Sequence, residues 1–281
     1  MKQDYFHLYS GPKFSEKDSE NPELLNLIDD YLLKRRGYIV KMPKPGESVV
    51  ACMSGGLDST ANIAMLLEEY KLEVYPFFIK RGQSCYVYEK EAVDYFDAFF
   101  SARYPKLYHQ VKEIEIITPP KAYKKELKAG LTSNNISYPA RNSIIFLTGA
   151  EYGYTLSRNG KTIKTLFASH VSSDGSFHCS QTWTRLTNLT ICTCLNDYEW
   201  QFISLPIETA FDNYYDKDVY VSYCEKHAIP LEHTRTCVKD NIIACGDCPP
   251  CWERRRVYRD LGIPDKKQYL YPMAKTIPTH Y

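Results

Sequence analysis

Residues 54–60 read Ser-Gly-Gly-Leu-Asp-Ser-Thr and combine the groups needed to hold a chain of phosphates. Two glycines let the backbone approach an anion closely, and a helix that follows them would present unpaired N–H groups and a partial positive charge. The hydroxyls of Ser54, Ser59 and Thr60 add donors, and Asp58 could hold a magnesium ion beside the phosphates. A short glycine motif is weak evidence alone, because ordinary strand-to-helix turns contain it too.

The segments on either side of this turn favour the phosphate-binding interpretation. Residues 49–53 are an apolar run typical of a short buried strand, and residues 61–67 carry apolar side chains at helical spacing. No Gly-Lys-Ser/Thr closes the turn, so it is not the Walker form of a phosphate loop. The turn matches S-G-G-x-D-S and so resembles the PP-loop ATP pyrophosphatases. That resemblance implies cleavage of ATP between the α and β phosphates, with transfer of AMP to a substrate.

A second group of chemically capable residues lies late in the chain, where four of the ten cysteines are spaced C-x7-C-x2-C-x2-C: Cys237, Cys245, Cys248 and Cys251. Two-residue gaps bring successive thiolates round one centre, and four sulfur ligands with no open position suit a structural, tetrahedral Zn²⁺. An iron–sulfur cluster and scattered core cysteines are the alternatives. Cys192 and Cys194, one residue apart, would form a poor disulfide and are predicted to be structural.

Length, charge and termini narrow the class of protein. The 281 residues suit one α/β domain of generous size. Its 35 basic and 34 acidic residues nearly balance at +1, which argues against a broad footprint for tRNA or DNA. No signal-peptide core and no apolar run of membrane-spanning length is found. We therefore expect a soluble, cytoplasmic protein without membrane partners, whose cysteines are metal ligands or core thiols.

Alternating strand and helix patterns predict a doubly wound, mostly parallel α/β sheet with ligands at the C-terminal edge of its strands. Strands are expected at 49–53, 73–79, 107–117, 164–171 and 202–205, and helices at 22–36, 61–67, 85–101, 139–156 and 216–227. Residues 181–194 are ambiguous, and 121–137 are expected to form a loop over the site. Three units are predicted: an N-terminal extension at 1–46 with a helix and a short strand at 38–40, a nucleotide-binding domain at 47–235, and a zinc-binding segment at 236–281.

Four separated motifs together resemble the 7-cyano-7-deazaguanine synthase, or QueC, family over about residues 47–265. In chain order they are Ser54–Ser59, Arg81-Gly82-Gln83, Pro139-Ala140-Arg141-Asn142, and the cysteine cluster followed by Arg254. The resemblance implies a HUP-like fold of the adenine nucleotide alpha-hydrolase type. It also implies ATP and Mg²⁺ as cofactors, 7-carboxy-7-deazaguanine as substrate, and is compatible with a homodimer.

The implied reaction begins with adenylation, because hydroxide leaves a carboxylate poorly whereas AMP leaves an acyl adenylate readily. Ammonia then gives the amide, and a second ATP converts the amide into the nitrile. The resemblance assigns catalytic roles to Asp58, Arg141 and Lys217, with Arg141 as a fork for phosphate or carboxylate and Lys217 as a contact to the α-phosphate. A structural ion pair for Arg141 and a solvated surface lysine for Lys217 are the alternatives. Nucleotide binding is assigned to Ser54, Gly55, Gly56, Leu57, Asp58, Ser59, Gly82, Gln83 and Asn142.

The segment after the predicted strand at 164–171 departs from the family pattern. Asp174 and Cys179 fit that pattern, but its arginine and tyrosine are absent. His170 and His178 could be new substrate or acid–base groups, although a hydrogen-bonded structural histidine is the commoner outcome.

Other functions remain open beside the biosynthetic one. Relatives occur in antiviral defence operons, so transfer of the activated deazaguanine to a protein amine, such as the N-terminus of a partner, is the alternative to ammonia. A PP-loop enzyme that modifies tRNA fits the near-neutral charge less well. A non-catalytic zinc module would give no reason to keep an intact phosphate loop.

Overall fold

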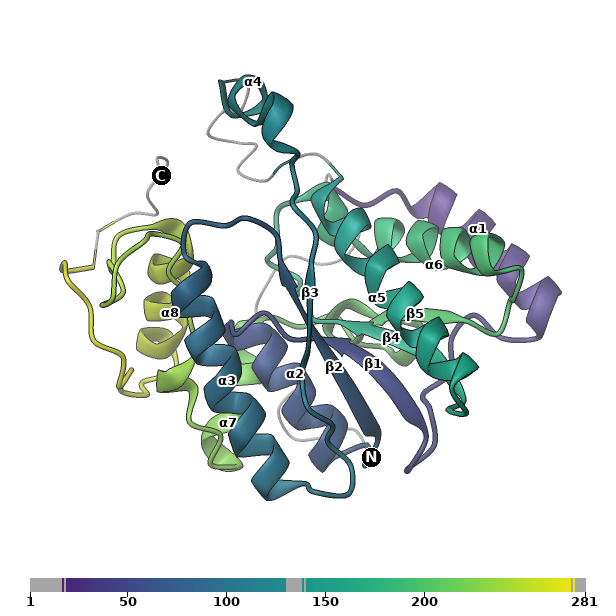
Figure 1. The fold of residues 1–281 in the computed structure, drawn as a ribbon, viewed down its shortest axis with the longest axis horizontal. Coiled ribbons are helices and arrows are strands. Elements are labelled where there is room, and N and C mark those ends of the chain that lie inside the picture. The colour runs from purple at the N-terminus through teal and green to yellow at the C-terminus, as the bar shows by residue number, and fades with distance from the viewer. Residues whose placement is uncertain (1–16, 18, 130–137, 139, 274, 276–281) are drawn as a thin grey trace.

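The computed structural model describes residues 17, 19–129, 138, 140–273 and 275, and a five-stranded sheet forms the centre of this part of the chain (Figure 1). Its strands are β1 (Ser48–Cys52), β2 (Glu73–Lys80), β3 (Lys112–Glu115), β4 (Ile163–Ala168) and β5 (Gln201–Ser204). Neighbouring strands all pair in parallel, in the order β3-β2-β1-β4-β5. The order reverses between β1 and β4, which is where open α/β sheets bind ligands.

Helices cover both faces of the sheet (Figure 1). On one side lie α2 (Leu57–Glu68), α3 (Tyr86–Arg103), α7 (Lys217–Lys226) and α8 (Pro249–Asp260), and on the other lie α1 (Pro22–Arg36), α5 (Arg141–Arg158) and α6 (Gln181–Leu195). Successive side chains of a strand point to opposite faces. Accordingly, Val49 and Ala51 of β1 enter one apolar core and Val50 enters the other. The predicted doubly wound α/β class is confirmed.

The N-terminal helix α1 packs against α6, and a buried ion pair connects the two helices. Arg185 of α6 is fully buried, with its guanidinium 2.5 Å from Asp29 of α1 and 2.7 Å from Glu208. Asn21 caps α1 by accepting a hydrogen bond of 3.0 Å from the Leu24 amide. The Asp29–Arg185 pair fixes how α1 lies on α6, because removing either partner would leave a buried charge uncompensated.

Two expectations about local structure are wrong. Residues 38–40 form no strand, because the guanidinium of Arg36 binds the carbonyls of Tyr38 and Ile39 that a neighbouring strand would need. Residues 121–129 are not a loop: a short 3-10 turn (Lys121–Tyr123) leads into α4 (Lys124–Ala129), whose lysines, leucine and alanine favour helix. The rest of that expected loop, 130–137, lies outside the described residues.

The ambiguous stretch at 181–194 is helix α6, and α8 is a helix that the sequence pattern did not predict. Further 3-10 turns occupy Phe177–Cys179, Leu205–Ile207, Thr209–Phe211 and Leu231–His233. Within the described ranges, none of the helices combines the length and apolar character needed to cross a membrane.

Candidate active site

The turn between β1 and α2 lies at the C-terminal edge of the central strand and has the geometry of a phosphate cradle. Gly55 has a φ of +75°, and a Cβ on it would lie 2.7 Å from the carbonyl oxygen of Glu89, so a larger residue does not fit. The hydroxyl oxygens of Ser54 and Ser59 are 3.0 Å apart. In the described part of the chain no side chain caps the start of α2, whose N-cap is Gly56. The first N–H groups of α2 are therefore available to an anion.

Replacing Gly55 by alanine is expected to distort this cradle. The added Cβ meets the Glu89 backbone at a positive φ, so we expect a loss of about 1–3 kcal/mol in the free energy of unfolding and at least a tenfold weaker affinity for ATP. Calorimetric titration with a non-hydrolysable ATP analogue and urea denaturation measure the two effects. Gly37→Ala is the matched control, because Gly37 has a φ of +81° and a Cβ added there would meet nothing within 4 Å. Unchanged nucleotide affinity in Gly55→Ala would contradict the cradle.

Lys217, the first residue of α7, is the meeting point of three carboxylates. Its Nζ lies 3.3 Å from Glu253, 3.6 Å from Asp174 and 3.9 Å from Asp58. These partners come from α8, from the segment after β4 and from α2, so the site joins three separate parts of the chain. The Lys217 side chain is 11% exposed, and the interpretation as a solvated surface lysine is wrong.

The electrostatics of this cluster keep the lysine charged. Burial acts against its charged form, but the attraction of Asp58, Asp174 and Glu253 outweighs burial, and the pKa of Lys217 lies well above its usual value. Burial raises the pKa of Asp58 to about 7, in spite of the neighbouring ammonium of Lys217. The Asp58 Oδ1 atom is buried and has no hydrogen-bond partner among the described residues. A buried carboxylate oxygen without a donor, beside a phosphate cradle, fits a hard cation such as Mg²⁺.

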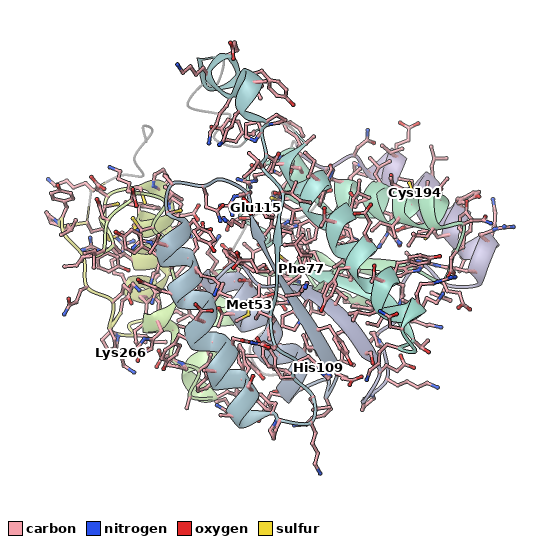
Figure 2. The ribbon with its side chains drawn as sticks, viewed as in Figure 1. Met53, Phe77, His109, Glu115, Cys194 and Lys266 are labelled. Atoms are coloured by element: carbon pink, nitrogen blue, oxygen red, sulfur yellow. The ribbon has the colours of Figure 1, made fainter. Side chains whose placement is uncertain are left out.

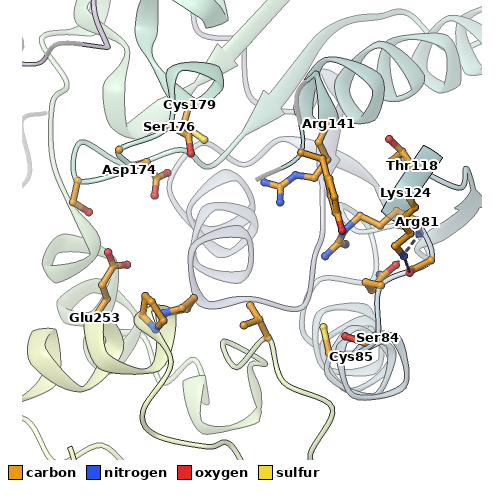
Figure 3. A pocket seen from close by; sticks show the side chains of 18 residues that line it. Arg81, Ser84, Cys85, Thr118, Lys124, Arg141, Asp174, Ser176, Cys179 and Glu253 are labelled. Atoms are coloured by element: carbon orange, nitrogen blue, oxygen red, sulfur yellow. Dashed lines mark hydrogen bonds between the residues drawn. The ribbon is translucent and has the colours of Figure 1, made fainter. Parts of the chain in front are cut away.

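A cavity of about 590 Å³ adjoins this cluster, a size suited to a small-molecule ligand (Figure 3). Figure 3 shows Asp174 and Glu253 on one side of the opening and Arg81, Lys124 and Arg141 on the other. The walls come from the turn after β2, the segment from the end of β3 to the start of α4, the start of α5, the segment after β4, Val238 and the start of α8. The cavity therefore offers an acidic wall and a basic wall to one ligand or to two adjacent ligands.

The turn after β2 is fixed by Glu89 of α3. The guanidinium of Arg81 donates to both oxygens of Glu89 at 3.2 and 3.0 Å, a bidentate pair. The amide of Gln83 donates to Glu89 at 2.6 Å and accepts from the Arg81 backbone N–H at 2.8 Å. Gly82 and Gln83 both line the cavity, but the Gln83 side chain is already bound within the protein. Its contact with a nucleotide stays a prediction.

Arg141 and Asn142 begin α5 and have different surroundings. Arg141 lines the cavity, and its Nε donates to Asn142 Oδ1 at 3.1 Å. Asn142 is buried, and its amide donates to the His178 carbonyl at 3.1 Å and lies 3.4 Å from Cys179 Sγ. Asn142 thus joins α5 to the segment after β4. A direct contact between Asn142 and a nucleotide stays a prediction.

His170 is part of the core behind this segment. Its ring packs edge-on against Phe146, with centroids 5.4 Å apart, and against Trp183 at 5.6 Å. Burial lowers the pKa of His170 to about 4. The ring is therefore neutral near pH 7 and packs as a structural group, which agrees with the commoner outcome for a histidine.

This depressed pKa predicts a specific dependence of stability on pH. The unfolded chain binds a proton at His170 near pH 6.5 and the folded chain only near pH 4, so His170 contributes stability above pH 6.5 that is lost as the pH falls through about 4. The loss amounts to about 3 kcal/mol across this window. When the free energy of unfolding, measured by urea denaturation, is plotted against pH, His170→Gln should show a shallower slope between these pH values than the wild type. His233→Gln, at an exposed position, is the control, and parallel curves for His170→Gln and wild type would contradict the assignment.

The four late cysteines come together in the structure. Their sulfur atoms all lie within 4.8 Å of one another. The Cys237–Cys245 and Cys245–Cys251 sulfur pairs are 3.4 and 3.9 Å apart. A tetrahedral site with metal–sulfur bonds of about 2.3 Å has sulfur atoms about 3.8 Å apart, whereas a disulfide needs about 2.05 Å. The backbone N–H of Cys245 points at Cys237 Sγ from 3.3 Å, which favours a thiolate. The donor set fits a metal ion.

The cysteine segment is connected directly to the phosphate cradle through Arg235. The backbone N–H of Arg235 donates to the Gly55 carbonyl at 2.7 Å. Its guanidinium donates to the carbonyls of Cys237 and Lys239 at 3.0 and 2.5 Å. One residue therefore holds both the loop between the first two cysteines and the turn that would bind phosphate. Cys194 lies far from this segment, exposed on α6 (Figure 2).

Sequence reasoning missed several residues of the site. Glu253 was overlooked, although Pro249, Pro250 and Glu253 are spaced to share one face of a helix, and all three line the cavity. Lys124 lies in the stretch expected to be a loop, and Arg81 belongs to a motif that assigns it no role of its own. Only the tertiary structure places these side chains round one cavity with Asp174.

Comparison of the sequence with known proteins finds a matching family model and several similar proteins. The family model described as "Queuosine biosynthesis protein QueC" matches residues 48–262. A 7-cyano-7-deazaguanine synthase 1 of Desulfitobacterium hafniense is 26% identical over 215 residues, which cover 74% of this chain and 90% of that protein. A 7-cyano-7-deazaguanine synthase of Acetivibrio thermocellus is 28% identical over 235 residues, which cover 79% and 97%.

A solved structure, the U34-tRNA thiolase NcsA from Methanococcus maripaludis with its [4Fe-4S] cluster, has a TM-score of 0.40 and 13% identity over 85% of this chain and 73% of its own. A likeness this low bears on neither fold nor ligand.

Proposed function

This chain belongs to the QueC family, and from that premise we propose that it is an ATP-dependent enzyme acting on 7-carboxy-7-deazaguanine. It adenylates the carboxylate with release of pyrophosphate, couples it to ammonia to give the amide with release of AMP, and converts the amide into 7-cyano-7-deazaguanine with a second ATP. The family match at 48–262 includes the phosphate cradle, the cavity residues and the four cysteines. The observation that carries the proposal is Lys217, whose carboxylate partners connect the cradle to the cavity.

Different residues would bind the phosphates of ATP and the acid substrate. The N–H groups of Gly55, Gly56 and the start of α2 hold phosphate oxygens. Lys217 supplies a fixed positive charge where negative charge develops at the α-phosphate, and preorganised charge of this kind is a large part of catalysis. Asp58 would hold Mg²⁺, which when bound neutralises phosphate charge.

The cavity walls complement the two ends of the proposed substrate. Arg141 offers a fork to an anionic group, either the substrate carboxylate or a phosphate. Asp174 and Glu253 offer acceptors to the N–H groups of a guanine-like ring, with which carboxylates pair well. Since segments that are far apart in the chain line the cavity, it can hold the reacting groups in one orientation.

The zinc assignment belongs to the same proposal. Four buried sulfur donors favour Zn²⁺ in a closed structural site, and its role would be to fix α8 and Arg235 beside the cavity. Elemental analysis of the purified protein separates zinc from an iron–sulfur cluster.

A single assay tests the reaction. Purified protein is incubated with ATP, Mg²⁺, 7-carboxy-7-deazaguanine and ammonium, and the products are followed by mass spectrometry. We expect AMP, pyrophosphate and the cyano product together, with none of them when the acid is omitted. Absence of AMP in the complete mixture would contradict the proposed substrate.

A second candidate keeps adenylation but changes the acceptor to a protein amine. It draws on two exposed apolar side chains: Val238, which lines the cavity and is 38% exposed, and Phe177, which is 70% exposed in the segment after β4 but does not line the cavity. These two side chains would be available to a macromolecular acceptor, and aromatic side chains are common in such contacts. In the same assay, with ammonium as the only amine, this candidate predicts pyrophosphate and an acyl adenylate without nitrile. AMP would then form only as water hydrolyses that adenylate back to the acid.

A further inference from the structure

The cavity wall that follows β4 is held largely by contacts from other segments of the chain. We call residues 172–182 the wall segment; it contributes Ser173, Asp174, Gly175, Ser176 and Cys179 to the cavity. Within it, the Asp174 N–H donates to the Val171 carbonyl at 3.1 Å, and the Asp174 carboxylate accepts from the Val171 N–H at 3.1 Å. Other segments also hold it: the Ser172 N–H donates to the Tyr215 carbonyl at 3.0 Å, the Ser173 hydroxyl to Asp216 at 2.5 Å, and the Asn142 amide to the His178 carbonyl at 3.1 Å. A segment built this way keeps one conformation only while its outside contacts hold.

One such contact comes from Lys17, more than 150 positions earlier in the chain. Its ammonium donates to the carbonyls of Ser172 and Asp174, the latter at 2.9 Å. A lysine ammonium has three donors, so it can bind both carbonyls at once and fix their separation. The carboxylates of Asp174, Glu20 and Asp216 attract the same ammonium. Lys17 therefore holds the beginning of the wall segment.

The end of the wall segment is held by the residues immediately before α1. The Glu20 carboxylate accepts from the backbone N–H groups of Gln181 and Thr182 at 2.8 and 2.9 Å and from the Thr182 hydroxyl at 2.8 Å. The Asn21 N–H donates to the same hydroxyl at 2.9 Å. These N–H groups are the unpaired donors of the first turn of α6, where a negative charge is favourable.

We propose that Lys17 and Glu20 form a clamp that positions the wall segment and thereby sets the affinity of the cavity for the acid substrate. Both ends of the segment are held by residues close together in the chain, and α1 behind them is anchored through the Asp29–Arg185 pair. Lys17 and Glu20 are positioning residues, because neither lines the cavity. The family match begins at residue 48, so the clamp lies outside the matched region. The choice of substrate rests on the proposed function, whereas the clamp itself does not.

Hydrogen exchange of the full-length protein without ligands tests the clamp directly. Loss of a hydrogen bond to a charged group raises the equilibrium constant for local opening about tenfold. We therefore expect about tenfold faster exchange of the Ser172 and Asp174 amides in Lys17→Met, and of the Gln181 and Thr182 amides in Glu20→Ala. Lys17→Arg should restore protection. Lys34→Met and Glu23→Ala, at exposed positions of α1, are matched controls. Unchanged exchange in Lys17→Met and Glu20→Ala would overturn the clamp.

Steady-state kinetics test its effect on the substrate. Lys17→Met is expected to raise KM for the acid about tenfold, with kcat and KM for ATP changed less than twofold, and Lys17→Arg should recover most of the loss. A fall in kcat with KM unchanged would contradict a role in substrate affinity. If wild-type protein makes no AMP from this acid, the proposed function fails, and the exchange experiment still decides the clamp. If the wild-type enzyme is active but Lys17→Met and Glu20→Ala exchange their amide hydrogens at the wild-type rate, the clamp is contradicted and the proposed function is not.

Discussion

Asp58→Ala is expected to lower the rate of AMP formation by about 10²- to 10³-fold while the protein stays folded. The substitution removes the buried oxygen that has no partner among the described residues and that fits Mg²⁺. Lys217 keeps Asp174 and Glu253 as partners, so its buried charge remains paired and the fold should survive. The rate is measured by chromatography of AMP, and folding by thermal denaturation.

Two further variants complete this experiment: one separates the charge of Asp58 from its shape, and the other is a control at the surface. Asp58→Asn keeps the size of the side chain, and an equal loss of rate would assign the effect to the negative charge. Asp94→Ala removes an aspartate whose side chain is 60% exposed on α3 and should leave the rate unchanged. A normal rate in Asp58→Ala would place Asp58 outside the catalytic machinery.

Cys248→Ser is expected to lose bound metal, stability and activity together. Apparent binding energies of structural zinc sites are on the order of 10 kcal/mol, so weakening one of four ligands should lower the free energy of unfolding by several kcal/mol. Activity should fall as well, because Arg235 ties this segment to Gly55, and Glu253 of the adjoining helix contacts Lys217. Elemental analysis, denaturation and AMP formation measure the three effects.

Cys194→Ser is the matched control for this substitution. Cys194 is exposed on α6, far from the four-cysteine segment (Figure 2), and its replacement should leave metal content and activity unchanged. Full metal stoichiometry in Cys248→Ser would contradict the metal site. Metal loss with normal AMP formation would limit the metal to a role in stability.

The parts of this site that the sequence predicts are those whose chemistry is local. Two glycines beside serines and an aspartate identify a phosphate cradle, and cysteines at two-residue gaps identify a metal site, because neighbouring residues must share one centre. The alternation of strands and helices is also a pattern visible along the chain, and it predicts a parallel sheet. Gly55 and Cys248 could therefore be found without a structure.

Other parts depend on contacts between distant segments, which no local pattern records. Glu253 reaches Lys217 only because α8 packs on α7, and Lys17 reaches Asp174 only because α1 packs on α6. The expected strand at 38–40 fails for a similar reason. Its carbonyls are bound by Arg36, and the apolar pattern of the stretch carries no sign of that competition.

Glu89 gives this architecture a thermodynamic consequence. Its backbone carbonyl lies against Gly55, and its carboxylate holds Arg81 and Gln83, so one residue of α3 supports both the phosphate turn and the basic wall. A ligand that shifts either surface must shift the other through the first turns of α3. Binding of the nucleotide and of the acid is therefore expected to be coupled, and linkage requires each ligand to change the affinity for the other by the same factor. Equilibrium titration of each ligand in the presence of the other would show this reciprocity as two equal ratios of dissociation constants.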